Sequence, residues 1–189
     1  MHSSGAAAMK LSKHYVWDPL VRVFHWSLVA AFCANAFFTR PGKITHQWVG
    51  YVVAGLIALR LIWGLVGTRH ARFVDFLPSP TGAMRQLRDM ITGRKHAHVG
   101  HSPLGALMIY NLLVTMAGLA ITGYMMTTVA YFGVKWVGEV HEALVTWAEV
   151  SIVAHITAVV VESRRLRVNL PISMLTGYKS IPHPDVADE

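Results

Sequence analysis

Four histidines on three apolar stretches are the residues of this chain best suited to hold a metal cofactor. His141 and His155 lie fourteen residues apart on one stretch. At about 100° and 1.5 Å per residue, they share one helix face and stand about 21 Å apart. His25 and His46 lie near the starts of the first and second stretches. Two haems stacked across a membrane need this arrangement, because each iron takes one imidazole from each of two helices.

The composition indicates a membrane protein. Of 189 residues, 53% are apolar and only 14% are charged, whereas soluble domains carry about 25% charged residues. The formal net charge is +7, but the basic residues lie between the apolar stretches, which is typical of a cytoplasmic membrane face rather than of nucleic-acid binding. The single cysteine, Cys33, excludes a disulfide framework, a thiolate zinc site and C-x-x-C-H attachment. Any haem is therefore held non-covalently.

Four apolar stretches are predicted to span the bilayer: residues 23–38, 48–66, 102–134 and 140–161. The third is longer than one span needs. The fourth contains Glu142 and Glu149 but is kept, because polar groups inside a bundle mark functional sites. The expected fold is an all-α membrane protein, a four-transmembrane-helix bundle enclosing two b-type haems. Residues 1–16 are expected to be a cytoplasmic segment, 17–179 the four-helix domain and 180–189 a disordered tail.

Flanking charge predicts the direction of the spans. Lysine and arginine are frequent in the N-terminal segment, in the second connection and in the C-terminal tail, which includes Lys179. The other two connections hold only Arg40, Lys43 and Lys135. Both termini and the long middle loop are therefore predicted to be cytoplasmic.

This direction assigns a depth to each histidine. His25 and His155 lie near the cytoplasmic face, and His46 and His141 lie near the external face. The predicted iron ligands are therefore the pairs His25–His155 and His46–His141. Two imidazoles per iron leave no open coordination position, so such haems transfer electrons rather than bind oxygen.

Three further side chains are candidates for the cofactor site at the cytoplasmic level. Arg60 lies on the helix face of His46 and needs an anionic partner, for which an inner haem propionate is favoured over snorkelling to the interface. For Arg22, a haem propionate partner and snorkelling to the interface are equally favoured. His101 begins the third span and is a candidate to bond a propionate or a quinone headgroup. Glu149 is either neutral and buried or part of a proton path, and the sequence leaves both open.

Five segments, in this order and spacing, resemble the bacterial membrane cytochrome b family that contains cytochrome b561 and the cytochrome b subunits of nickel–iron hydrogenases. The resemblance implies a four-helix bundle with two b-type haems, whose ligands fall on the four histidines above. It covers nearly all of residues 17–179. The segments are VWDPLVRVFHW (16–26), HQWVGY (46–51), RLIWG (60–64), GHSPLGALM (100–108) and HEALVTWAEVSIVAH (141–155).

The resemblance implies electron exchange between the quinone pool, as ubiquinone or menaquinone, and a redox partner. GHSPLGALM is more similar to the hydrogenase-subunit branch, yet the absence of a fifth span favours a stand-alone cytochrome that serves an external c-type cytochrome. Two alternatives are a superoxide:quinone oxidoreductase, with Arg40, Lys43 and Lys135 steering the anion, and a hydrogenase membrane anchor. A scaffold protein without a redox role is a third. Whether the chain is itself an enzyme stays open.

Overall fold

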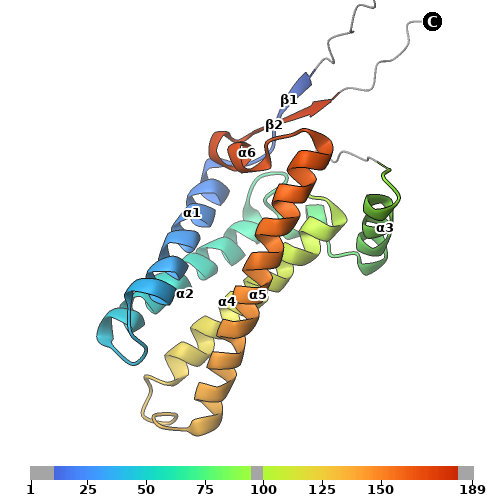
Figure 1. Ribbon diagram of the computed structural model, residues 1–189. Helices are drawn as coiled ribbons and strands as arrows, with labels where there is room; N and C mark the ends of the chain where they lie inside the picture. The colour runs from blue at the N-terminus through green and yellow to red at the C-terminus, as the bar shows by residue number, and fades with distance from the viewer. Residues whose placement is uncertain (1–10, 95–99, 183–189) are drawn as a thin grey trace, which may run out of the picture.

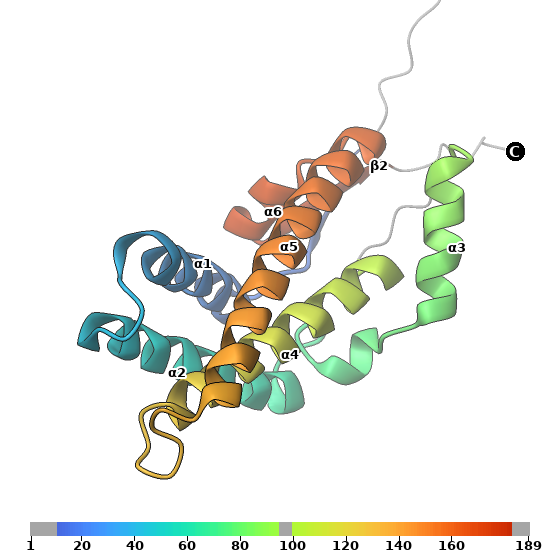
Figure 2. The same ribbon diagram turned by 60° about the horizontal axis from the view of Figure 1, so that its bottom comes forward.

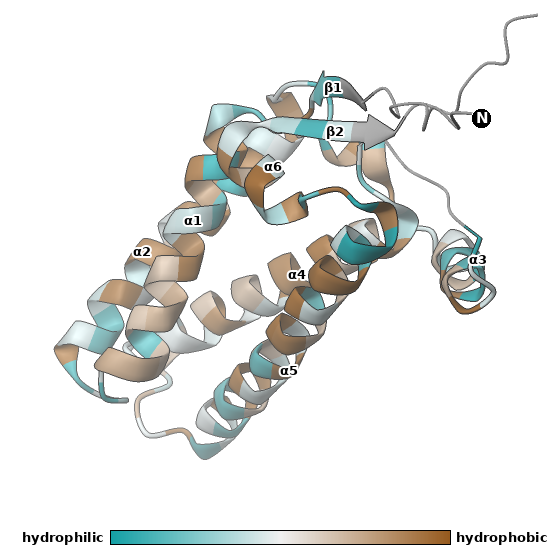
Figure 3. Ribbon diagram, turned by 45° about the horizontal axis from the view of Figure 1, so that its top comes forward, coloured by the Kyte–Doolittle hydropathy of each residue, from teal (hydrophilic) through white to brown (hydrophobic). Residues whose placement is uncertain are grey.

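The computed structural model describes residues 11–94 and 100–182. Four of its helices are long and apolar enough to cross a membrane, as predicted. They are α1 (Pro19–Cys33), which continues into a π-helical turn (Ala34–Phe38), α2 (Ile44–Val66), α4 (Pro103–Met125) and α5 (Lys135–Leu166). Figure 3 shows that these helices carry most of the hydrophobic residues.

Polar caps followed by proline set the start of most helices. In each case a side-chain oxygen accepts a hydrogen bond from the backbone N–H three residues later, and the proline fits the first turn, where its missing N–H costs nothing. The shorter helices α3 (Pro80–Ile91) and α6 (Leu170–Thr176) begin in the same way as α1 and α4. The caps are Asp18, Ser79, Ser102 and Asn169.

Two helix ends differ from the sequence expectation. The long third stretch is helical only to Met125, after which threonine hydroxyls bond back to nearby carbonyls and residues 126–134 form turns. The fourth span is longer than predicted, because α5 has 32 residues. At about 1.5 Å per residue it is about 48 Å long, which exceeds a hydrocarbon layer of about 30 Å. The ends of α5 therefore reach the headgroup layers.

Helix α4 is central, because it packs against both α2 and α5, while α1 packs against α2 (Figure 2). Within the described ranges, α1 and α5 are not among the closely packed helix pairs. The two helices that carry His25 and His155 are therefore held apart by their neighbours rather than against each other. The buried core joins all four helices through Phe24, Ala31, Val53, Ile57, Leu113, Met116, Leu119 and Ala148.

The two ends of the described chain pair in a small antiparallel sheet, which the sequence did not predict (Figure 1). Strand β1 (Leu11–Tyr15) pairs with β2 (Tyr178–Pro182), with Leu11 opposite Pro182. The expected disordered tail from Ser180 is wrong for its first three residues, because β1 satisfies their backbone groups; residues 183–189 lie outside the described part. We call this end of the bundle the terminal end, and the end with residues 39–43 and 126–134 the loop end.

Candidate haem-binding site

The four predicted ligands lie in two pairs, one toward each end of the bundle. In the terminal half, His25 of α1 is within electrostatic range of His155 of α5. In the loop half, His46 of α2 is in the same relation to His141 of α5. Among the described residues no group of three or more metal-binding side chains occurs. The geometry therefore offers two sites of two imidazoles each.

Threonine hydroxyls orient both imidazoles of the loop-end pair. The Thr122 hydroxyl lies 2.7 Å from the carbonyl oxygen of Gly118, to which it donates. Since its hydrogen is engaged there, its oxygen accepts the Nδ1–H of His141 at 2.9 Å. Thr39 likewise donates to Asn35 and accepts from Nδ1 of His46 at 3.1 Å. Both rings are therefore left with Nε2 as the free ligand atom, and the hydroxyls fix their tautomer.

The π-helical turn after α1 positions this support. It ends the helix so that Asn35 and Thr39 face the first turn of α2, where the Asn35 amide donates to the carbonyl oxygen of His46 at 3.2 Å. A π-helical segment often occurs at a functional site. On the other side, Gly123 of α4 lies against the His141 ring, where a Cβ would stand 3.4 Å from the ring, an ordinary contact.

The terminal-end pair has a different environment. Nδ1 of His25 is buried and has no hydrogen-bond partner among the described residues. The Trp26 indole contacts the His25 ring at 5.0 Å, edge to face. Among the described residues, His25 is therefore oriented by packing rather than by a hydroxyl group.

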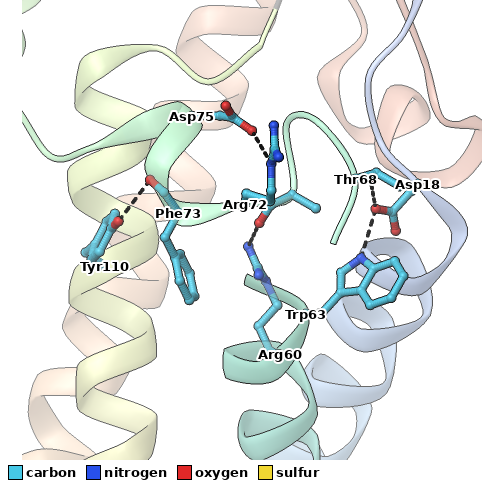
Figure 4. Close-up of polar contacts among 9 residues, drawn as sticks. Asp18, Arg60, Trp63, Thr68, Arg72, Phe73, Asp75 and Tyr110 are labelled. Atoms are coloured by element: carbon cyan, nitrogen blue, oxygen red, sulfur yellow. Dashed lines mark hydrogen bonds and ion pairs between the residues drawn. The ribbon is translucent and has the colours of Figure 1, made fainter. Parts of the chain in front are cut away.

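Arg60 of α2 is held inside the bundle toward its terminal end and does not snorkel, since it is only 4% exposed. Its Nη2 donates to the carbonyl oxygen of Ala71 at 3.0 Å, and its guanidinium lies 4.8 Å from the ring centroid of Phe73 (Figure 4). Its Nη1 is buried without a partner in the described chain. A buried guanidinium with an unused N–H group is suited to an anionic ligand.

A glycine allows this contact between Arg60 and Phe73. A Cβ on Gly64 would lie 2.1 Å from the Phe73 ring, so no larger residue fits without moving the ring. Tyr110 of α4 fixes the same loop by donating its hydroxyl to the carbonyl oxygen of Phe73 at 3.3 Å. In the segment RLIWG, Gly64 therefore leaves space for the Phe73 ring, and Arg60, four residues earlier, contacts that ring.

Asp18 ties the start of α1 to the end of α2, and sequence reasoning missed it. Its carboxylate accepts from the indole of Trp63 at 3.0 Å, from the Thr68 hydroxyl and from the backbone N–H of Val21 (Figure 4). Burial acts to raise the pKa of Asp18, but these hydrogen bonds outweigh it and lower the pKa. The Asp-Pro dipeptide after Trp17 was the available signal, because it marks a capped helix start.

Arg22 and His101 both lie at the terminal end. Arg22 donates to the carbonyl oxygen of Leu175 at 2.6 Å, while its Nε is buried without a partner in the described chain. The His101 ring lies 4.1 Å from that of Phe76 and 4.8 Å from that of Trp17. Burial, aided by the positive charge of nearby basic side chains, lowers the pKa of His101 to about 3. His101 is therefore neutral near pH 7 and can offer a hydrogen bond but no charge.

Two charged residues take positions that the sequence did not indicate. Lys179, which counted as a flanking surface charge, is only 7% exposed and lies 3.4 Å from the carbonyl oxygen of Gly100. Burial lowers its pKa, although Glu162 acts in the opposite direction. Glu149 is exposed on α5 and forms no hydrogen bond or ion pair with a described residue. The buried alternative for Glu149 is therefore wrong.

The residues present fit b-type haem. Two imidazoles contributed by different helices are the donor set of a six-coordinate haem iron. Arg22 and Arg60, both toward the terminal end, each have a buried N–H group without a partner among the described residues, and a propionate could satisfy it. Gly50 and Gly55 have open space where a Cβ would be, whereas Gly118 is in close contact with Leu144 of α5. Small residues thus leave room on α2 and bring α4 close to α5.

The fold is that of a helical membrane protein with four apolar helices that are long enough to cross a bilayer. Residues 16–177 match the prokaryotic cytochrome b561 family. The chain therefore belongs to that family of b-type cytochromes.

Curated relatives are distant and are matched in part. The chain is 24% identical over 148 residues to the probable Ni/Fe-hydrogenase B-type cytochrome subunit of Rhizobium leguminosarum bv. viciae, covering 64% of this chain and 62% of that protein. It is 24% identical over 138 residues to the probable Ni/Fe-hydrogenase 1 B-type cytochrome subunit of Escherichia coli K12, covering 59% of each. The chain thus spans about three-fifths of the length of these relatives. No solved structure matches it significantly.

Proposed function

We propose that this cytochrome carries electrons across the bacterial inner membrane, between membrane quinone and an external redox partner such as a c-type cytochrome. The observation that carries the proposal is the placement of two imidazole pairs at opposite ends of one bundle. Two b haems bound there would supply one-electron centres near both faces of the membrane. With a single haem, an electron would still have to cross most of the bilayer thickness without a redox centre.

The chain's own residues would have distinct roles at the two levels. His46 and His141 bind the outer haem, with Thr39 and Thr122 fixing their ring orientation. His25 and His155 bind the inner haem. Arg60 and Arg22 compensate the negative charge of the haem propionates. Neutral His101 donates a hydrogen bond to a propionate or to a quinone headgroup. The apolar core between the levels excludes water.

The orientation is proposed from the charge of the connecting segments. The terminal end, which carries most of the arginines, faces the cytoplasm, and the loop end faces outward. The β1–β2 pairing supports this arrangement, because it holds both ends of the described chain on one side. A reporter fused after Glu189 should be active only as a cytoplasmic fusion, and periplasmic activity would reverse all depth assignments.

Electron transfer is tested with the purified holoprotein in sealed vesicles that contain quinol, with oxidised c-type cytochrome outside. Quinol-dependent reduction of the external cytochrome is expected, and His46→Ala should abolish it while the inner haem still becomes reduced. If quinol reduces both haems but no c-type cytochrome becomes reduced, the proposal that the external partner is a c-type cytochrome is wrong.

A second candidate is a membrane subunit that exchanges electrons with a nickel–iron hydrogenase. The names of the two curated relatives favour it. Copurification with a hydrogenase and hydrogen-dependent haem reduction would distinguish it from the first candidate. Superoxide oxidation has less support, because Lys135 of the cationic loop end is paired with Glu139 at 3.4 Å. Rapid haem reduction by superoxide would restore that alternative.

A further inference from the structure

The groove between the end of α5 and the start of α6 carries two arginines that the electron-transfer role does not use. The groove has a volume of about 410 Å³, which suits a headgroup rather than a whole lipid. Arg164 and Arg167 contribute charge, Ser163 and Asn169 contribute polar groups, and valines and a proline form the rest. The full lining is Val160, Ser163, Arg164, Arg167, Val168, Asn169 and Pro171.

The two arginines are available to a ligand. Both are exposed, and neither side chain forms a hydrogen bond or ion pair with a residue in the ranges 11–94 and 100–182. Arg165, between them in sequence, is instead paired with Glu162 at 2.9 Å and contacts the Arg94 carbonyl. The acid nearest in sequence is thus already bound by Arg165, so the groove keeps its positive charge.

Arg167, which lines the groove, has a backbone conformation that is strained for a residue other than glycine. Arg167 ends α5 with φ 55° and ψ 35°, the left-handed conformation in which helices usually place glycine. Glycine does occupy the equivalent position after α6, at Gly177 with φ 89°. Strained non-glycine residues concentrate at functional sites.

The groove lies where a lipid headgroup would be. The apolar part of α5 ends near Val161, and Arg164 follows about 4.5 Å further along the helix axis. Exposed apolar side chains flank the groove on α6, where Ile172 is 51% and Leu175 58% exposed. Basic pockets beside membrane helices recognise anionic lipid headgroups. We propose that this groove binds the phosphodiester headgroup of an anionic phospholipid, with its acyl chains against α6.

The inference is independent of the haem ligands, and its test uses the purified holoprotein in detergent. Phosphatidylglycerol is titrated in, and bound lipid is counted by native mass spectrometry. At about 1 kcal/mol per basic side chain, Arg164→Gln with Arg167→Gln should weaken binding about 30-fold. The matched control is Arg85→Gln with Arg88→Gln on α3, which removes the same charge and should change binding less than about twofold.

A second variant separates binding from folding. Arg167→Gly removes the guanidinium but suits the left-handed backbone, so binding should weaken about fivefold without a lower unfolding temperature. Equal losses in both double variants, or equal binding of phosphatidylcholine, would overturn the proposal. Competition by millimolar inorganic phosphate would also overturn it, because the site would then serve free phosphate.

Discussion

Nδ1 of His141 lies 2.9 Å from the hydroxyl oxygen of Thr122, whose own hydrogen is used by a backbone carbonyl of α4. The hydroxyl therefore acts as an acceptor that makes the proposed ligand more basic and holds its ring in one orientation. The same relation at His46 and Thr39 makes the loop-end site the better supported of the two.

Removing the Thr122 acceptor should weaken the outer haem site specifically. Thr122→Val is expected to lower haem affinity at this site about tenfold and to raise its midpoint potential, because a less basic ligand stabilises the oxidised iron less well. The matched control is Thr115→Val, since Thr115 donates to the Asn111 carbonyl in the same way but contacts no histidine. A redox titration checks both, and equal shifts would contradict the role of Thr122.

Arg60 should set the potential of the inner haem. Removing its positive charge is expected to favour the oxidised state, so Arg60→Gln should lower the midpoint potential of the His25–His155 haem and leave the outer haem nearly unchanged. Arg72→Gln is the control, because Arg72 lies nearby but pairs with Asp75 at the surface. If neither haem shifts, or both shift alike, Arg60 binds no propionate.

Asp18 should stabilise the fold in a pH-dependent way. Its lowered pKa means that its contribution is complete above the unfolded value of about 3.9 and is lost as pH falls through the lower folded value. Asp18→Asn is therefore expected to cost about 1–3 kcal/mol at pH 7 and less at pH 3. Asp75→Asn, at an exposed ion pair, should cost under about 1 kcal/mol. Thermal unfolding at both pH values measures this, and a pH-independent cost would contradict the ionised role.

Gly64 should tolerate no side chain. Gly64→Ala would push the Phe73 ring away from Arg60 and is expected to destabilise the protein by about 1–3 kcal/mol. Gly50→Ala is the matched control on the same helix, because a Cβ at Gly50 would meet nothing within 4 Å. Unfolding temperatures of the apoproteins compare the two. Gly50→Ala should be neutral or stabilising, because alanine favours the helix, and a Gly64→Ala protein as stable as Gly50→Ala would contradict the role of Gly64.

The length and composition of the apolar stretches were sufficient to predict the four spans, because both follow from the bilayer. The direction of the spans and the ligand pairs stay predictions. The supporting contacts could not be predicted. Thr39 reaches His46 only because α1 ends in a π-helical turn, and Thr122 reaches His141 only through the packing of α4 on α5. The β1–β2 sheet was missed because residues 11–15 and 178–182 show no alternating pattern and pair across nearly the whole chain.

The proposed binding of two haems by the pairs His25–His155 and His46–His141 underlies every role assigned above. The decisive measurement combines the pyridine haemochrome assay, which counts the haems, with absorption spectra of the native protein, which distinguish the two sites, on the purified protein and on the four single His→Ala variants. We expect two extractable haems per wild-type chain and one in each variant, with His25→Ala and His155→Ala losing the same spectral component. One haem in the wild-type protein, or loss of the same component in His25→Ala and His46→Ala, would show that the pairing is wrong.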